Sequence, residues 1–288
     1  MRIGLVTDST AQLSAAELAR LDELTGGLMQ VVPLTVIVGG VEFTDGELSP
    51  EELCRAMSEG TEVSTSQATP AQFANAFATL IDHGAESVIT VTMSGELSGT
   101  RDSAVTAAEA QPIFIDVVDS RTTSAGLAGA VSIAAHGISQ GLDAESIAGT
   151  VADWNAGETT TLFAPRTLEH LRRGGRIGAA SSLLGRALQI VPVLGLRAGA
   201  VVPLARVRTW SKALERMAKL SAEAAAGFDE SVRVEIQHAG GEGDHADVVW
   251  LEERFAGLGL ETARRTLSPV ITAHVGPGAI GVTVQTTR

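Results

Sequence analysis

Short polar side chains follow three apolar runs of this sequence, at the point where each run ends. The residues at these points are Asp8-Ser9, Ser94 and Asp119-Ser120. In open α/β sheets, ligands bind beside the carboxyl ends of the strands. The backbone N–H groups at the starts of the following helices favour negative charge there. This pattern predicts a rim of hydroxyl groups suited to binding an anion.

A fourth polar segment, Val63–Gln67, has the sequence VSTSQ and comes directly before a predicted helix start at Thr69. Thr65 in this segment and Ser94 both stand where a helix does not need their hydroxyl group as a cap. A ligand role and a structural role therefore stay open for both. Asp8 and Asp119 fit N-cap or turn positions better than catalytic ones, because Asp side chains accept hydrogen bonds from nearby backbone N–H groups.

A serine hydrolase or acyltransferase is the main alternative to a binding protein. The segment Ser94–Gly99, SGELSG, resembles a nucleophile elbow only loosely, because Glu96 stands where the elbow around Ser98 needs a glycine. His274, in a Gly/Pro-rich segment that we expect to be a loop, is the histidine that could pair with either serine. Spacing along the chain does not establish such a triad.

Two further segments carry weaker signals. His238 and His245 flank the glycine-rich stretch 240–243, but with Asp244 and Asp247 they match no known metal-ligand spacing, so a metal site is disfavoured.

The segment 173–176, RGGR, combines a tight turn with the guanidinium group of Arg176, which suits a carboxylate, a single phosphate or a surface salt bridge. No phosphate-binding loop of the G-x-x-x-x-G-K-[ST] type is present. We therefore expect no ATP binding by this chain alone and no cofactor.

The composition excludes several classes of protein. Of 288 residues, 44% are hydrophobic and 19% charged, which is typical of a globular chain. The net charge of −13 and the absence of Tyr argue against nucleic-acid binding and stable membrane insertion. A single cysteine, Cys54, excludes a disulfide framework. The first residues lack the apolar stretch of a secretory signal, so we expect a cytoplasmic protein.

Strands and helices alternate through the first half of the chain, which predicts a largely parallel sheet covered on both faces. The helices begin with Ser or Thr caps followed by Pro or Glu. The strands are expected at 2–6, 86–92 and 112–118, and the helix starts at Ser14, Ser49 and Thr69, with a long small-residue helix within 122–142. A hairpin is expected from Val31–Val38 and Val41–Phe43, joined by Gly39-Gly40.

The weakly apolar stretch 155–158 is the predicted linker, so we expect domains at residues 1–157 and 158–288. The second domain mixes a hairpin, helices and strands, which predicts an α+β fold with a mixed sheet. Its strands are expected at 160–164, 191–196, 200–207, 231–238, 261–267 and 278–285, and its helices at 181–188, 211–226 and 244–255.

Seven short motifs occur along the chain in the order seen in one bacterial family. They are VTDST at 6–10, VPL at 32–34, TSQ at 65–67, LSGT at 97–100, VDS at 118–120, GGRI at 174–177 and HVGPGAIG at 274–281. By these motifs the chain resembles the DegV family from residue 3 to residue 284. That family includes the fatty-acid-binding subunits of bacterial fatty acid kinase.

The resemblance implies a two-domain α/β protein that holds a long-chain fatty acid in an apolar tunnel. Thr65 and Ser94 would bind the carboxylate, with His274 nearby. A separate ATP-dependent kinase subunit would convert the acid to an acyl phosphate, and the residues implied to meet that kinase or the phosphate are Arg176, Arg208 and Asp45. The protein itself would be a binding subunit without catalytic residues.

This sequence departs from the family pattern at four positions. Gly95 replaces the second serine of the serine motif, and Arg101 stands where an aromatic residue is usual. Ala68 follows TSQ in place of proline, and Val275 follows His274 in place of threonine. The threonine and first-serine positions are intact, so the differences bear on the groups around them.

Overall fold

A computed structural model describes residues 2–184, 190–240 and 244–287. The contacts divide the chain into two compact units: unit 1 holds residues 1–35 and 66–157, and unit 2 holds 36–65 and 158–288. The domains expected from the sequence were continuous, with residues 36–65 in the first. The structure groups these residues with the second part instead. The reason is local, since α2 (Pro50–Ser58) packs against α10 (Pro269–Val275).

Unit 1 is built on the parallel sheet that the sequence predicted. Its strand order is β2-β1-β6-β7, and every neighbouring pair runs parallel. The bounds are Met29–Val32 for β2, Ile3–Asp8 for β1, Ser87–Thr92 for β6 and Phe114–Asp119 for β7. All six residues of β1 and of β6 are buried, as expected for central strands covered on both faces.

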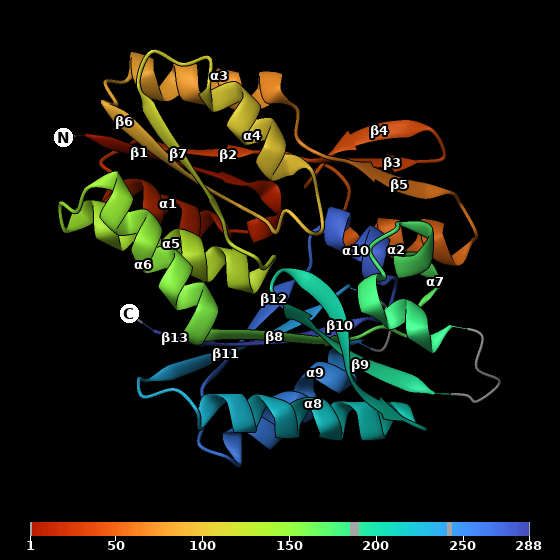
Figure 1. The fold of residues 1–288 in the computed structure, drawn as a ribbon. Coiled ribbons are helices and arrows are strands. Elements are labelled where there is room, and N and C mark those ends of the chain that lie inside the picture. Colours follow the sequence, from red (N-terminus) through yellow and green to blue (C-terminus); the bar gives the residue numbers. More distant parts are fainter. Residues whose placement is uncertain (1, 185–189, 241–243, 288) are drawn as a thin grey trace. The chain divides into compact units, whose positions relative to one another are not determined.

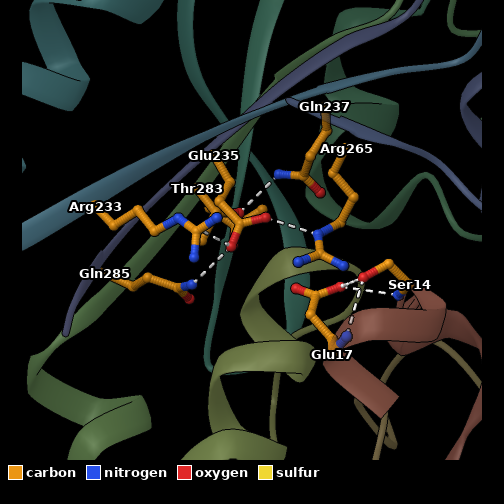
Figure 2. A network of polar contacts seen from close by, with 9 residues as sticks. Ser14, Glu17, Arg233, Glu235, Gln237, Arg265, Thr283 and Gln285 are labelled. Carbon is orange, nitrogen blue, oxygen red and sulfur yellow. Dashed lines mark hydrogen bonds and ion pairs between the residues drawn. The ribbon is translucent and has the colours of Figure 1, made fainter. Parts of the chain in front are cut away.

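Helices cover both faces of this sheet (Figure 1). The pair α3 (Pro70–Asp82) and α4 (Thr100–Ala108) packs on one face, and α5 (Ala125–Ser139) and α6 (Ala144–Gly157) pack on the other. A 3₁₀ turn, η1 (Ser9–Ala11), follows β1, and α1 (Ala15–Leu24) packs on α5. The predicted capping box of α1, between Ser14 and Glu17, is confirmed (Figure 2).

The predicted linker at 155–158 is wrong, because residues 155–157 are the last residues of α6. Ile147, Val151 and Trp154 recur at helical spacing and are all buried. Burial of this face, with Trp154 only 1% exposed, carries the helix to Gly157. The adjacent strand β8 (Thr159–Ala164) then starts after a single residue.

Unit 2 contains a six-stranded mixed sheet, as the sequence predicted. Its order is β10-β9-β8-β13-β11-β12, in which only β11 and β12 run parallel among the described pairs. The bounds not yet given are Val191–Arg197 (β9), Ala200–Val207 (β10), Val232–His238 (β11), Thr262–Thr266 (β12) and Ile280–Thr286 (β13). On one face, α8 (Trp210–Ala225) and α9 (Asp244–Ala256) close an apolar core that includes Met217, Ile236 and Phe255.

Residues 35–66 add a second, three-stranded sheet of order β4-β3-β5, together with α2. Its strands are Thr35–Val38 (β3), Val41–Thr44 (β4) and Val63–Ser66 (β5). The predicted Gly39-Gly40 turn is confirmed, since both residues have positive φ. The predicted single strand Val31–Val38 is wrong: β2 ends at Val32, because Pro33 has no N–H to continue the ladder.

Short helices complete unit 2. These are α7 (Glu169–Arg173), the 3₁₀ helix η2 (Gly178–Leu183) and α10. The helix expected at 181–188 is replaced in its described part by η2, which ends at Leu183, and residues 185–188 lie outside the described residues. The sequence did not predict α10. It packs on α2 and α7, and its Val275 joins a small apolar cluster with Cys54 and Ala239.

Candidate functional site

Thr65 and His274, two of the residues singled out from the sequence, are in direct contact within unit 2. The Oγ1 atom of Thr65 lies 2.8 Å from Nε2 of His274, within hydrogen-bond distance. Both side chains are half-buried. They come from positions 209 residues apart, Thr65 from β5 and His274 from α10. The fold therefore brings together a hydroxyl group and an imidazole group that the sequence could only place separately.

His274 lies in the last turn of α10, which corrects our expectation of a loop. Ser268 is the N-cap and accepts a hydrogen bond from the backbone N–H of Ile271, and Pro269 occupies the first turn. The helix ends at Val275, and the capping residue that follows, Gly276, has a φ of +85°, which only glycine adopts easily. The Gly/Pro-rich segment is thus the end of a short helix that fixes the direction of the imidazole.

The surroundings of His274 keep its imidazole neutral. Burial, and to a smaller extent the nearby positive charge of Arg176, lower the pKa of His274 from its ordinary value to about 4. The ring packs against Gly174, because a β-carbon on that glycine would overlap Nδ1. A neutral imidazole has one N–H donor and one acceptor nitrogen. At neutral pH, His274 can therefore donate one hydrogen bond without carrying charge.

Arg176 follows the tight turn at Gly174-Gly175 after α7. Its backbone N–H donates to the carbonyl of Leu171, and its guanidinium group donates to the carbonyl of Gly174 at 2.5 Å. The neighbouring Arg172 and Arg173 instead pair with Glu169, which lowers the pKa of that carboxyl group to about 2. Arg176 is exposed and lies close enough to His274 to affect its pKa. Its positive charge therefore lies near the imidazole.

Asp45 and Arg208, the other two residues implied to meet a kinase, also belong to unit 2. Asp45 lies in the turn after β4, and Arg208 is exposed directly before Thr209, the N-cap of α8. Both are on elements other than β5 and α10.

Ser94 belongs to unit 1, after the end of β6. It is fully buried, its backbone N–H donates to the carbonyl of Thr122, and its Oγ accepts from the N–H of Glu96 at 3.2 Å. Ser98, the other serine of this segment, contacts the Oγ1 atom of Thr100 at 2.8 Å. Both hydroxyl groups therefore organise the loop that leads into α4.

The structural interpretation of Asp8 and Asp119 is confirmed by their hydrogen bonds. Asp8 is the N-cap of η1, accepts from Thr10, and also accepts from the N–H of Met93 at 2.7 Å. Asp119 accepts from the N–H groups of Arg121 and Gly95. These carboxylates tie the ends of neighbouring strands together.

The weaker metal hypothesis concerned His238, His245, Asp244 and Asp247. No group of three or more potential metal ligands occurs in the chain segments that the structure describes, and residues 241–243 of the flanking stretch lie outside them. Asp247 instead accepts hydrogen bonds from Arg166 and Trp210. Across 2–184, 190–240 and 244–287, no helix is both long and apolar enough to cross a bilayer.

Sequence reasoning missed the residues that pack against the two glycines following His274. His170 in α7 lies against Gly276, and Arg166 lies against Gly278, which follows α10. The signal was present in the sequence, where two glycine-containing segments each carry basic residues, but nothing in the spacing indicates which side chain meets which glycine.

Comparison with known proteins identifies the family. The family model for DegV, described as an uncharacterised protein of that family, matches residues 2–287. The chain belongs to the DegV family. It is 36% identical to DegV domain-containing proteins of Streptomyces coelicolor, over 286 residues, and of Deinococcus radiodurans, over 289 residues. The alignments cover 98% and 99%, respectively, of both chains.

Solved structures of DegV proteins share this fold. A DegV family protein of Thermus thermophilus, whose structure is described for its fatty acid binding, is 33% identical with a TM-score of 0.90. DegV of Bacillus subtilis, described as a fatty acid binding protein, is 25% identical with a TM-score of 0.86. Each comparison covers the whole of both chains. The α/β class predicted from the sequence is therefore confirmed.

Proposed function

We propose that this protein binds one long-chain fatty acid and presents its carboxylate to a separate ATP-dependent kinase. The observation that carries the proposal is the 2.8 Å contact between Thr65 Oγ1 and His274 Nε2. A carboxylate only accepts hydrogen bonds. If His274 Nε2–H donates to Thr65 Oγ1 in this contact, the Thr65 O–H is left to donate to the carboxylate, a head group that would be costly to bury without partners.

Arg176 complements the Thr65–His274 pair electrostatically. A cation beside a partly buried anion favours the ionised form of a carboxylic acid. We propose that the same guanidinium group, with Arg208 and Asp45, meets the kinase or the transferred phosphate. The resemblance assigns Ser94 to the carboxylate as well, and replacing Ser94 tests that assignment directly.

The acyl tail supplies most of the binding free energy in this proposal. Removing a methylene from water contributes about 0.8 kcal/mol, so a chain of about 16 carbons contributes roughly 12 kcal/mol before the costs of association. The tail is expected to lie in an apolar tunnel, while the hydroxyl and imidazole groups fix the position of the carboxylate. The fatty acid binding described for the Thermus and Bacillus relatives supports this assignment.

In the proposed reaction, a carboxylate oxygen of the bound acid attacks the γ-phosphorus of ATP on the kinase. The bond between that phosphorus and the ADP oxygen breaks, which yields an acyl phosphate and ADP. The chain described here contributes binding and orientation. The hydrolase alternative is less well supported, because the described contact of the His274 imidazole is to a threonine and the two candidate serines organise their own loop.

The test measures oleate binding to the purified, delipidated protein by calorimetry, after mass spectrometry of the lipid that it carries on purification. Thr65→Ala is expected to weaken binding about tenfold or more, because a hydrogen bond to a charged group contributes about 1.5–3 kcal/mol. Ser66→Ala is the matched control, since Ser66 is the exposed neighbour on the same strand. Absence of long-chain acid in the purified protein, together with no oleate binding, would refute the proposal.

The presentation step is tested separately with a purified bacterial fatty acid kinase subunit, ATP and oleate-loaded protein. Arg208→Glu is expected to slow ADP formation while leaving bound oleate in place. Arg176→Glu is expected to slow ADP formation and also to weaken oleate binding, because it places a negative charge near the carboxylate. ADP formation by oleate-loaded Arg208→Glu at the rate of the unmodified protein would contradict the assigned kinase contact of Arg208.

A further inference from the structure

In unit 2, side chains of each of two segments pack against glycines of the other segment. The first runs from Arg166 to Arg176 and the second from His274 to Gly278. A β-carbon on Gly174 would overlap the ring of His274, and one on Gly276 would overlap the ring of His170. On Gly278 it would lie 3.0 Å from both Cγ and Nε of Arg166. The two segments are therefore interlocked at three points, and His274 is one of the interlocking side chains.

Arg166 contacts three groups outside its own segment. Its Nε donates to the carbonyl of Gly278 at 3.0 Å, and its Nη2 pairs with Asp247 at 2.6 Å. Its guanidinium carbon lies 3.4 Å from the centre of the Trp210 ring. The indole N–H of Trp210 donates to the same Asp247 oxygen at 2.8 Å. Arg166 thus connects the loop after α10 to the first turns of α8 and α9.

We propose that Arg166 is a positioning residue for the head-group site, which it serves by holding the Gly276–Gly278 loop and thereby the orientation of His274. The role in ligand binding rests on the proposed function, whereas the effect on the imidazole does not. Arg166 does not touch His274 in the contacts described above. It acts through the loop that continues from His274.

The geometry explains why this position needs support. α10 has only seven residues, fewer than a helix needs to be stable by itself, so packing must fix its last turn. Gly276 and Gly278 both have positive φ, and glycine has more backbone freedom to lose than any other residue. The hydrogen bond from Arg166 to Gly278 restricts this freedom. Lysine cannot replace it, because only a guanidinium group can stack flat on Trp210 while donating in two directions.

The first experiment needs no ligand. Histidine side-chain NMR of the lipid-free protein reports the ring environment and pKa of His274 in Arg166→Ala, Arg166→Lys and the unmodified protein. We expect both variants to shift the His274 resonances and to raise its pKa toward the ordinary value of 6.5, because a displaced ring becomes better hydrated. Unchanged His274 resonances and pKa in both variants would overturn the proposal.

The second experiment is a double-mutant cycle on oleate affinity. Arg166→Ala is expected to raise Kd about tenfold in the unmodified protein but less than twofold when His274→Ala is already present, since the effect passes through the imidazole. An equal fold-change in both backgrounds would show a general structural effect and contradict positioning. If the unmodified protein binds no fatty acid, the proposed function fails while the NMR result still decides the role of Arg166.

A matched control is available in the same unit. Arg264 forms a two-point ion pair with Glu252 between β12 and α9, and its described contacts are to α9 rather than to either interlocking segment. Arg264→Ala removes an arginine–carboxylate pair of similar exposure and is expected to leave the His274 resonances and Kd unchanged. A shift of the His274 resonances in Arg264→Ala equal to that in Arg166→Ala would also overturn the proposal.

Discussion

At the scale of single residues, His274 combines partial burial with neighbours that disfavour its charged form. Its pKa of about 4 leaves it neutral over most of the pH range in which proteins are stable. The nearby Arg176 adds positive charge, so the region carries a favourable potential for an anion without a second cation on the imidazole. The neutral imidazole of His274 donates a hydrogen bond, and the separate guanidinium group of Arg176 supplies positive charge. A charged histidine would have to do both.

This pKa makes stability depend on pH in a defined direction. The pKa of His274 is lower in the folded state than the ordinary 6.5, so the unfolded chain binds more protons between pH 6.5 and 4. The contribution of neutral His274 to the unfolding free energy is fully present above about pH 6.5 and is lost as the pH falls through about 4. By linkage the loss is at most about 3 kcal/mol.

Urea unfolding of the protein and of His274→Asn at pH 7 and at pH 4 measures this effect. Lowering the pH from 7 to 4 should reduce the unfolding free energy of the unmodified protein more than that of His274→Asn. The exposed His83 provides the comparison variant, His83→Asn, for general effects of acid. A difference between unmodified protein and His274→Asn that stays constant with pH would contradict the prediction.

The elements show which signals in the sequence were sufficient. The helices that begin at Ser49-Pro50 and Thr69-Pro70 were predicted because an N-cap and a proline mark their starts, and long apolar faces follow. Ser268-Pro269 is the same signal at the start of α10 and could have been recognised. It was missed because the glycines after only seven residues suggested a loop.

The contact between Thr65 and His274 could not be predicted in the same way. It depends on the pairing of β5 in a separate three-stranded sheet and on the packing of α10 against α2 and α7. Neither feature has a local signal. The resemblance to a family named the residues, and only the tertiary structure placed the two side chains 2.8 Å apart.

The cap of α10 gives a prediction at this scale. Ser268→Ala removes the hydrogen bond to the N–H of Ile271 at 3.2 Å and should lower the unfolding free energy by about 1 kcal/mol. Because His274 lies in the same short helix, oleate affinity should fall as well. Ser14→Ala is the matched control, since it removes an N-cap from α1 in unit 1. Urea unfolding measures the stability of both variants, and calorimetry measures their oleate affinity. Equal oleate affinity in Ser268→Ala and Ser14→Ala would contradict the prediction that the α10 cap supports oleate binding.

At the scale of the whole molecule, unit 2 keeps a network of charged and polar groups on one face of its large sheet (Figure 2). Glu235 on β11 accepts from Nε of Arg265 at 2.7 Å and from Gln285 at 3.3 Å, and both charged side chains are less than a tenth exposed. Beside them, Gln237 donates to Thr283. The alternation in β11 is visible in the sequence, since Val234 and Ile236 enter the core while Glu235 and Gln237 share the other face.

Removing one charge of this pair should be costly. Glu235→Gln is expected to lower the unfolding free energy by about 1.5–3 kcal/mol, because the buried Arg265 loses a charge-assisted hydrogen bond to a carboxylate. The double variant Glu235→Leu/Arg265→Met should recover part of that loss. The exposed Glu253→Gln is the control and should stay within about 0.5 kcal/mol of the unmodified protein. Urea unfolding measures the unfolding free energy of each variant. A decrease of less than about 1 kcal/mol for Glu235→Gln would contradict the prediction.

The allocation of residues 36–65 to unit 2 has a practical consequence. The polypeptide passes between the units at 35/36, 65/66 and 157/158, so no single cut separates them. A fragment ending at 157 would carry a hairpin and a helix whose packing partners are missing, and one starting at 158 would lack the strand that supplies Thr65. Dissection of this protein therefore requires excising 36–65 from one half and splicing it onto the other.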